Sequence, residues 1–522
     1  MMDVSFGTIW EAVARRLPGA VAISEPGRDH TYAEFDDRAA RLATALVRAG
    51  VGPGDKVACY LYNGAAYLET VFAAFKIGAV PVNANYRYTG HELSALLRDA
   101  DAAAIVHSPE LAANVAHAAE TVATLRLVLQ TGRPLGTPPR PAGPRPGSDR
   151  LFMYTGGTTG RPKGVIWRQA DLLHALTVPI FRPLGVPELP STLDEAVELA
   201  VTARTEGRAP ATLPVVPLMH GTGLFNSMGA LLVGGRVITT RPGRLDPRHV
   251  WETVARQRAG MIIVAGDAVC RPLVDELAAA ERDGRPYDLG SLTSILSSGT
   301  VLSDGLKRAL HERAAITIVD ALAASEGGPF AFAITASAGD LPSRFRPAPA
   351  TKVIAADDTE VVPGSGEHGL LAYSGPIPLG YHKDPVKTGT TFRVIGGVRY
   401  AIPGDLAQVE ADGAIRFLGR GSGVVNTGGE KVYPQEVENA LLTHPGVTDC
   451  VVVGLPDETW GERVAAVVAT RDPALTERTL QDWVRPTLAG YKIPRRIVLL
   501  PALPRTPTGK LEIAWARRAA EE

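Results

Sequence analysis

Cysteine is scarce in this sequence of 522 residues, which has only Cys59, Cys270 and Cys450. Three cysteines so widely scattered cannot build a disulfide framework, and they lack the close spacing of a zinc site. They therefore indicate buried thiols in a reducing compartment, and we expect a cytoplasmic protein.

Net charge and long apolar runs are lacking as well. The 54 Lys and Arg residues nearly balance the 55 Asp and Glu residues, so no overall field draws the chain to nucleic acid or to an anionic membrane. No run of about 18 apolar residues occurs, which argues against a membrane-spanning helix. Asp3 and Glu11 near the start also argue against a signal peptide.

The chain does have length, since 522 residues exceed what one ordinary core needs, and two or more domains are expected. Over the first part, helical patterns at 32–50 and 65–79 alternate with strand patterns at 56–62 and 80–85. This rhythm predicts a mostly parallel sheet covered by helices. The Pro- and Gly-rich residues 131–149 are typical of a surface connection.

The second half of the sequence continues in three stages. Between 250 and 330 we expect helices at 251–260 and 287–292, each followed by a strand, and beyond 345 a β-rich subdomain. The Gly-rich residues 420–430 then separate a tail of about 100 residues, the size of a small domain. The predicted fold class is α/β. Residues 1–420 form a large N-terminal domain of layered α/β sheets with the β-rich subdomain, and residues 421–522 form a small α+β domain joined by a mobile hinge.

The most informative segment is LFMYTGGTTGRPKGV at 151–165. Its glycines let main-chain N–H groups approach an anion, its threonine hydroxyls add donors, and its lysine adds a mobile charge. It is not a Walker loop, because no Ser or Thr follows the lysine. A surface hairpin would explain the glycines but not the whole set, so we predict a polyphosphate site formed by Thr155, Gly156, Gly157, Thr158, Thr159, Gly160 and Lys163.

This segment resembles the phosphate-binding signature of the adenylate-forming superfamily, which includes acyl-CoA synthetases, peptide-synthetase adenylation domains and firefly luciferases. Further motifs of the superfamily follow in the expected order over essentially the whole chain. The resemblance implies an ATP-dependent acid–thiol ligase that uses Mg²⁺ and coenzyme A. Such an enzyme first makes acyl-AMP and then transfers the acyl group to the thiol.

The resemblance also implies roles for residues in the middle of the chain. In PLMHG (217–221), His220 would lie beside the acyl and adenylate groups. In VDALAASEGG (319–328), Glu326 would be the magnesium-linked carboxylate. The superfamily usually has an aromatic residue and a glycine where this chain has Leu322 and Ala323. The nucleotide-binding set from these motifs is Ser298, Gly299, Thr300, Asp320, Ala321, Leu322, Ala323 and Ser325.

Residues after 400 complete the resemblance. Asp405 and Arg420 would bind the ribose, and Ser422, between two glycines, would be the hinge. Gly428, Gly429 and Lys431 belong to the loop implied in thioester formation. Lys510, in PRTPTGKLEI (504–513), would place its ammonium against the carboxylate and the α-phosphate during adenylation.

Several stretches, among them GVIWR and IPLGYHKD, resemble ligases of actinobacterial type for fatty acids and sterol side chains. We therefore expect a bulky hydrophobic acid, with an acyl pocket near Trp167, Met219, Phe225, Gly266 and Asp267. Three alternatives stay open: a thioligase that takes acyl-AMP from a separate enzyme, an enzyme that acylates a carrier-protein phosphopantetheine, and a nucleotide-binding regulatory module. Assembly as a homodimer is open too.

Overall fold

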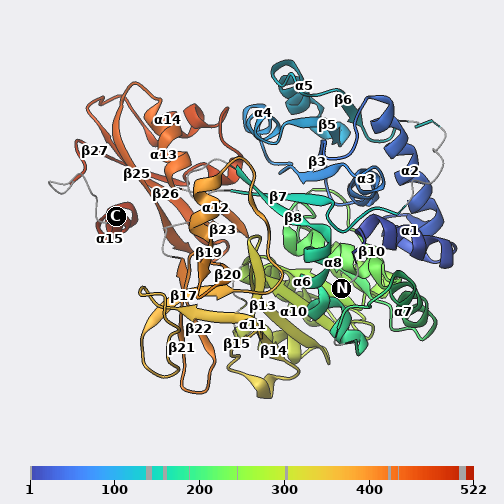
Figure 1. Ribbon diagram of the computed structural model, residues 1–522. Coiled ribbons are helices and arrows are strands. Elements are labelled where there is room, and N and C mark those ends of the chain that lie inside the picture. Colours follow the sequence, from blue (N-terminus) through green and yellow to red (C-terminus); the bar gives the residue numbers. More distant parts are fainter. Residues whose placement is uncertain are drawn as a thin grey trace.

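Four β-sheets with helices packed on them form the protein (Figure 1). The computed structural model describes residues 3–133, 135–136, 144–156, 162–186, 188–243, 245–299, 302, 304–420, 425–432, 434–504 and 513–522.

The first two sheets are mostly parallel and make up the larger part of the molecule. The seven-stranded sheet has the order β18 (Gly380–Tyr381), β8 (Pro162–Arg168), β7 (Arg150–Gly156), β4 (Val80–Asn83), β3 (Lys56–Tyr60), β5 (Ala102–His107) and β6 (Leu127–Gln130). The nine-stranded sheet has the order β15 (Arg346–Pro347), β14 (Gly327–Thr335), β13 (Thr317–Ala324), β12 (Ser294–Ser298), β11 (Met261–Val264), β9 (Ala211–Pro214), β10 (Arg236–Ile238), β1 (Val21–Glu25) and β2 (Arg28–Thr31).

Two smaller sheets follow along the chain. One is antiparallel and contains β19 (Phe392–Ile395), β20 (Val398–Ala401), β17 (His368–Tyr373), β21 (Asp405–Val409), β22 (Ile415–Arg420) and, paired with β17, β16 (Thr351–Ile354). The last contains β24 (Glu430–Val432), β23 (Val425–Thr427), β26 (Gly461–Thr470), β25 (Val447–Asp457) and β27 (Arg496–Leu500). This last sheet, on the left of Figure 1, forms the smaller C-terminal domain.

Helices cover the sheets because each presents an apolar stripe to them. In the first part these are α1 (Phe6–Arg16), α2 (Tyr32–Arg48), α3 (Ala65–Lys76), α4 (Gly90–Asp99), α5 (Ala112–Thr121), α6 (Gln169–Ala175), α7 (Leu193–Thr205), α8 (Gly221–Leu232), α9 (Pro247–Gln257), α10 (Gly266–Arg282), α11 (Asp304–His311) and α12 (Pro385–Thr391). The last are α13 (Pro434–Leu442), α14 (Glu477–Val484) and α15 (Ile513–Glu521). No helix in the described ranges is long and apolar enough to cross a membrane.

The predicted α/β class, with a large and a small domain, is confirmed. The pattern at 32–50 folds as α2, which begins with a capping box between Thr31 and Glu34. The helix predicted at 287–292 is wrong, because Asp288 accepts a hydrogen bond from the N–H of Gly290 and the segment turns instead. Helix α10 was not predicted, because Pro272 inside it weakens the helical pattern of its sequence.

Candidate active site

One cavity of about 900 Å³ is lined by both of the larger sheets and by the C-terminal sheet. Several of the residues predicted to bind nucleotide lie on its wall, namely Thr155, Ser298, Gly299, Ala321, Ala323 and Ser325. The predicted acyl-pocket residues Trp167, Met219 and Phe225 line it too, as do the predicted thioester residues Gly428, Gly429 and Lys431. Segments more than 100 residues apart in the sequence therefore meet at one space.

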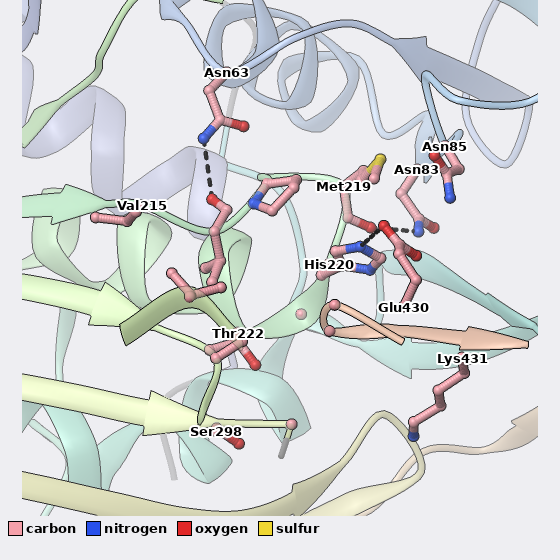
Figure 2. Close-up of a pocket in the computed structure, with 18 of the residues that line it drawn as sticks. Asn63, Asn83, Asn85, Val215, Met219, His220, Thr222, Ser298, Glu430 and Lys431 are labelled. Carbon is pink, nitrogen blue, oxygen red and sulfur yellow. Dashed lines mark hydrogen bonds and ion pairs between the residues drawn. The ribbon is translucent and has the colours of Figure 1, made fainter. Parts of the chain in front are cut away.

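Two asparagines hold the segment that carries His220 (Figure 2). Asn83, at the end of β4, donates to the carbonyls of Tyr154 and Met219 at 2.9 and 2.7 Å, and accepts from the N–H of Tyr154 at 2.6 Å. Asn63 donates to the carbonyl of Val216 at 3.0 Å and accepts from the N–H of Leu218 at 2.7 Å. These bonds fix the strand-to-helix connection that ends at His220, the N-cap of α8.

His220 meets the C-terminal domain at Glu430. Its Nε2 lies 3.2 Å from the Glu430 Oε1, and the Arg87 guanidinium lies at the same distance from that oxygen. Burial acts to raise the pKa of Glu430, but the His220 and Arg87 side chains outweigh it, so the pKa lies below its ordinary value. Glu430 is therefore a buried carboxylate that links the two domains at the edge of the cavity.

A second interdomain contact centres on the Lys492 ammonium. Its Nζ donates across the interface to Glu92 at 3.0 Å and within the small domain to Glu436 at 2.7 Å, and only 6% of the Lys492 side chain is exposed. The Tyr491 hydroxyl beside it accepts from Asn85 at 3.3 Å. Together with the Glu430 contact, these bonds hold the Gly428–Lys431 segment against the cavity.

The chain between β13 and β14 carries Glu326, whose Oε1 accepts a 2.8 Å hydrogen bond from the Tyr381 hydroxyl. Tyr381 is on β18, whose neighbour β8 begins at Pro162, within the segment predicted to bind phosphate. The Lys163 ammonium on β8 pairs with Asp384 at 2.6 Å, and this contact lowers the pKa of Asp384. The Tyr381 hydroxyl, which binds the Glu326 carboxylate, and the Lys163 ammonium are therefore fixed on the neighbouring strands β18 and β8.

The other predicted residues have different surroundings. Asp320 is buried in an ion pair with Lys307 at 3.0 Å, and burial raises its pKa against the effect of that ammonium. Leu322 packs against the main core. Asp405 and Arg420 are register partners on β21 and β22, and the Gly266 N–H donates to Ser297. Gly156 ends β7 and Asp267 is in α10, while Gly157, Thr158, Thr159, Gly160, Thr300, Ser422 and Lys510 lie outside the described residues.

The family model for AMP-binding enzymes matches residues 10–382, and the model for the AMP-binding enzyme C-terminal domain matches residues 436–510. The chain belongs to the AMP-binding enzyme family. The prediction of an ATP-dependent acyl-CoA synthetase, an acid–thiol ligase, is confirmed.

Relatives of this AMP-binding enzyme cover nearly its whole length. A 3-oxocholest-4-en-26-oate–CoA ligase of Rhodococcus rhodochrous is 37% identical over 540 residues, 99% of this chain and 96% of that protein. A medium/long-chain fatty-acid–CoA and 3-oxocholest-4-en-26-oate–CoA ligase of Mycolicibacterium smegmatis is 36% identical over 545 residues, 100% of this chain and 97% of that protein. Among solved structures, an amide bond synthetase from Marinactinospora thermotolerans aligns with a TM-score of 0.81 and 25% identity, covering 98% of this chain and 99% of that one.

Sequence reasoning missed several residues that shape the site of this AMP-binding enzyme. Asn83 and Asn63 could have been found, because polar residues directly after parallel strands gather at the carboxyl edge of a sheet. Glu430 and Lys492 gave no such signal, since His220 and Glu92, their partners in the large domain, lie 210 and 400 residues away in sequence.

Proposed function

We propose that this acyl-CoA synthetase activates a bulky hydrophobic carboxylic acid as its acyl-AMP and transfers the acyl group to free coenzyme A. One observation carries the proposal. The nucleotide motif residues, an apolar wall and the Gly428–Lys431 segment line the same cavity. Acid, nucleotide and thiol can therefore react in one shared space.

The first step overcomes the poor electrophilicity of a carboxylate. Its oxygen attacks the α-phosphate of ATP, pyrophosphate leaves, and the product is a mixed anhydride. The residues must mainly neutralise and align charge. Lys163 would exchange Asp384 for phosphate oxygens, Lys510 would contact the reacting carboxylate and α-phosphate, and His220 would bound the acyl and adenylate groups.

The turn at Glu326 fits a magnesium ion. The side chain is partly buried and the Tyr381 hydroxyl orients one of its oxygens, and Mg²⁺ prefers carboxylate oxygens together with nucleotide phosphates. When bound, the ion would supply neutralisation of charge on those phosphates. Glu326 would hold it, and the chain's own donors would hold the acid and the sugar, with Asp405 accepting the ribose hydroxyls.

In the second step the thiol of coenzyme A attacks the acyl carbon and AMP leaves. We assign residues 1–420 to the adenylation domain and residues 421–522 to a mobile lid that turns about Ser422. Turning would exchange Lys510 for the Gly428–Gly429 segment, because both cannot approach the same carbonyl. In the structure the Gly428–Lys431 segment lines the cavity, which supports the arrangement for thioester formation.

The acid class follows from the apolar wall and from the relatives. Trp167, Leu172, Leu176 and Phe225 give the cavity a broad apolar side, and relatives at 36–37% identity are named ligases for fatty acids and a sterol side-chain acid. We therefore propose steroid-side-chain or long-chain fatty acids as substrates, handled in the cytoplasm. A homodimer and a separate supplier of acyl-AMP stay open.

The decisive experiment incubates the protein with ATP, Mg²⁺ and octanoate, palmitate, benzoate or cholate, and records pyrophosphate, AMP and thioester separately. Pyrophosphate release before coenzyme A is added would exclude the thioligase reading. Offering coenzyme A and a phosphopantetheinylated carrier protein together would decide the acceptor. If no acid is turned over, the proposed function is wrong, and a nucleotide-binding regulatory module becomes the better interpretation.

The same assay tests Lys510. Lys510→Ala should lower acyl-AMP formation by about a hundredfold or more, since it removes charge that stabilises the transition state. Thioester formation from supplied acyl-AMP should persist. Equal loss of both steps would contradict the role assigned to Lys510.

A further inference from the structure

Trp167 contacts both the predicted acyl pocket and the turn that carries Ser325, a residue predicted to bind the nucleotide. Its indole lines the cavity beside Phe225 in an edge-to-face pair, with ring centroids 6.4 Å apart and the planes nearly perpendicular. Its Nε1–H donates a 3.0 Å hydrogen bond to the main-chain carbonyl of Ser325, and only 2% of the residue is exposed. One side chain thus forms the acyl wall and binds the turn that precedes Glu326.

The same turn has a second donor from the same ladder. Tyr381, which pairs with Val165 on β8, donates its hydroxyl to the Glu326 carboxylate at 2.8 Å. Strand β18 is joined to β8 by further main-chain bonds, from Leu379 to Ile166 and from His382 to Gly164. The Ser325–Glu326 turn, which joins β13 and β14 of the nine-stranded sheet, is therefore held by two side chains from the seven-stranded sheet.

The turn is the two-residue loop of a hairpin, closed by the pairing of Ala324 on β13 with Gly327 on β14. Gly328 follows closely with a φ of 107°, a conformation that a side chain would strain. Main-chain pairing closes the loop, and the two donors, Trp167 and Tyr381, bind the Ser325 carbonyl and the Glu326 carboxylate within it.

We propose that Trp167 is a positioning residue that couples recognition of the acid to adenylation, because its indole bounds the acyl chain while its N–H fixes the turn at which the nucleotide binds. The inference rests on the proposed function. Loss of the indole N–H removes this donor from the partly buried Ser325 carbonyl, and the turn then relaxes away from the nucleotide. A substitution of Trp167 in the acyl pocket therefore also weakens the binding of ATP.

The test removes one donor at a time. Trp167→Phe keeps an aromatic wall but lacks the N–H, and should weaken Mg-ATP binding, measured by calorimetry, by about tenfold. It should also change the KM for cholate more than that for octanoate. Tyr381→Phe, which does not line the cavity, should weaken Mg-ATP binding similarly and leave the KM of both acids unchanged. In the double variant, the loss of Mg-ATP affinity should be smaller than the product of the losses in the two single variants, since both donors fix one turn.

Two controls separate positioning from general loss of packing. Trp251 is fully buried and donates its indole N–H to the Leu273 carbonyl at 2.8 Å, so Trp251→Phe removes the same kind of bond outside the cavity. It should lower Tm and leave Mg-ATP affinity unchanged. Phe225→Leu should alter the KM for acids only.

Three results would overturn the inference: wild-type ATP affinity in Trp167→Phe, the same loss in Trp251→Phe, or fully additive losses in the double variant. If Trp167→Phe does not fold, Tyr381→Phe decides whether the turn depends on this ladder, and wild-type affinity there contradicts the inference. Absence of turnover with every acid would instead count against the proposed function, because ATP binding by the variants is measured without turnover.

Discussion

The two sides of the cavity are built with different chemistry. On the side of the large domain, Asn63 and Asn83 bind main-chain groups through neutral amides, and their partners lie on elements of the same domain. On the side of the small domain, the contacts are charged. Glu430 meets Arg87, and Lys492 meets Glu92 and Glu436.

This difference fits a cavity with two kinds of wall. The large domain forms a fixed wall, and the small domain forms a removable wall that can move away from the cavity. A neutral side chain that satisfies buried main-chain groups has no alternative partner while the domain stays folded, so its bonds persist. A buried ion pair gains little net free energy, because the desolvation of both charges roughly offsets their attraction. Charged residues that separate become hydrated again, and the small domain can leave the cavity at low cost.

The largest effect should come from breaking the charged side at its centre. Lys492→Met leaves Glu92 and Glu436 facing each other without a cation, which disfavours the docked arrangement by about 3 kcal/mol. Acyl transfer from supplied acyl-AMP to coenzyme A should therefore slow by about a hundredfold, while pyrophosphate release in the first step changes little. Lys352→Met is the matched control, since Lys352 pairs with Glu360 at an exposed site on β16. Equal slowing of both steps by Lys492→Met would show that the contact is not specific to docking.

Breaking the neutral side should act differently. Asn83→Ala removes three hydrogen bonds and leaves buried carbonyls of Tyr154 and Met219 unpaired, which should cost about 3 kcal/mol of unfolding free energy. Because this wall serves both steps, the rates of adenylation and of acyl transfer should fall together. Denaturant unfolding and the two separate assays measure this. Gln169→Ala, which removes a buried hydrogen bond from the Phe6 N–H between two residues that do not line the cavity, is the control and should lower stability alone.

The two sides also differ in how far the sequence predicted them. Main-chain segments such as that of Ser298 and Ala321 were predicted because local motifs specify them, and the cavity contains both. Asp320 belongs to the same motif, yet its carboxylate is buried against Lys307, a partner that only the tertiary fold reveals. The charged contacts of Glu430 and Lys492 were invisible for the same reason. Alternation of strands and helices predicted the parallel sheets, whereas α10 was missed because Pro272 obscures its pattern.

A smaller effect is expected at the tip of the removable wall. Gly428 has a φ of 59°, and a Cβ there would lie 2.5 Å from the Trp460 ring. Gly428→Ala should slow thioester formation about tenfold, through strain and displacement of Trp460. Gly429 has a φ of 82°, but the nearest atom to its added Cβ is 3.8 Å away, so Gly429→Ala reports strain alone. If both variants behave alike in the transfer assay, contact with Trp460 is irrelevant.

The smallest effect concerns pH and Glu430. Its pKa in the folded chain lies below the ordinary value of 4.5, so its ionised form contributes stability that is fully present above pH 4.5 and is lost as the pH falls through the lower folded value. Glu430→Gln removes that contribution while keeping the shape of the side chain. The Tm of the wild type should exceed that of the variant by about 2 °C at neutral pH, and the difference should shrink below pH 4.5. A difference that stays constant from pH 7 to 4 would mean that Glu430 acts through packing, and the removable wall would then be held by Lys492 without it.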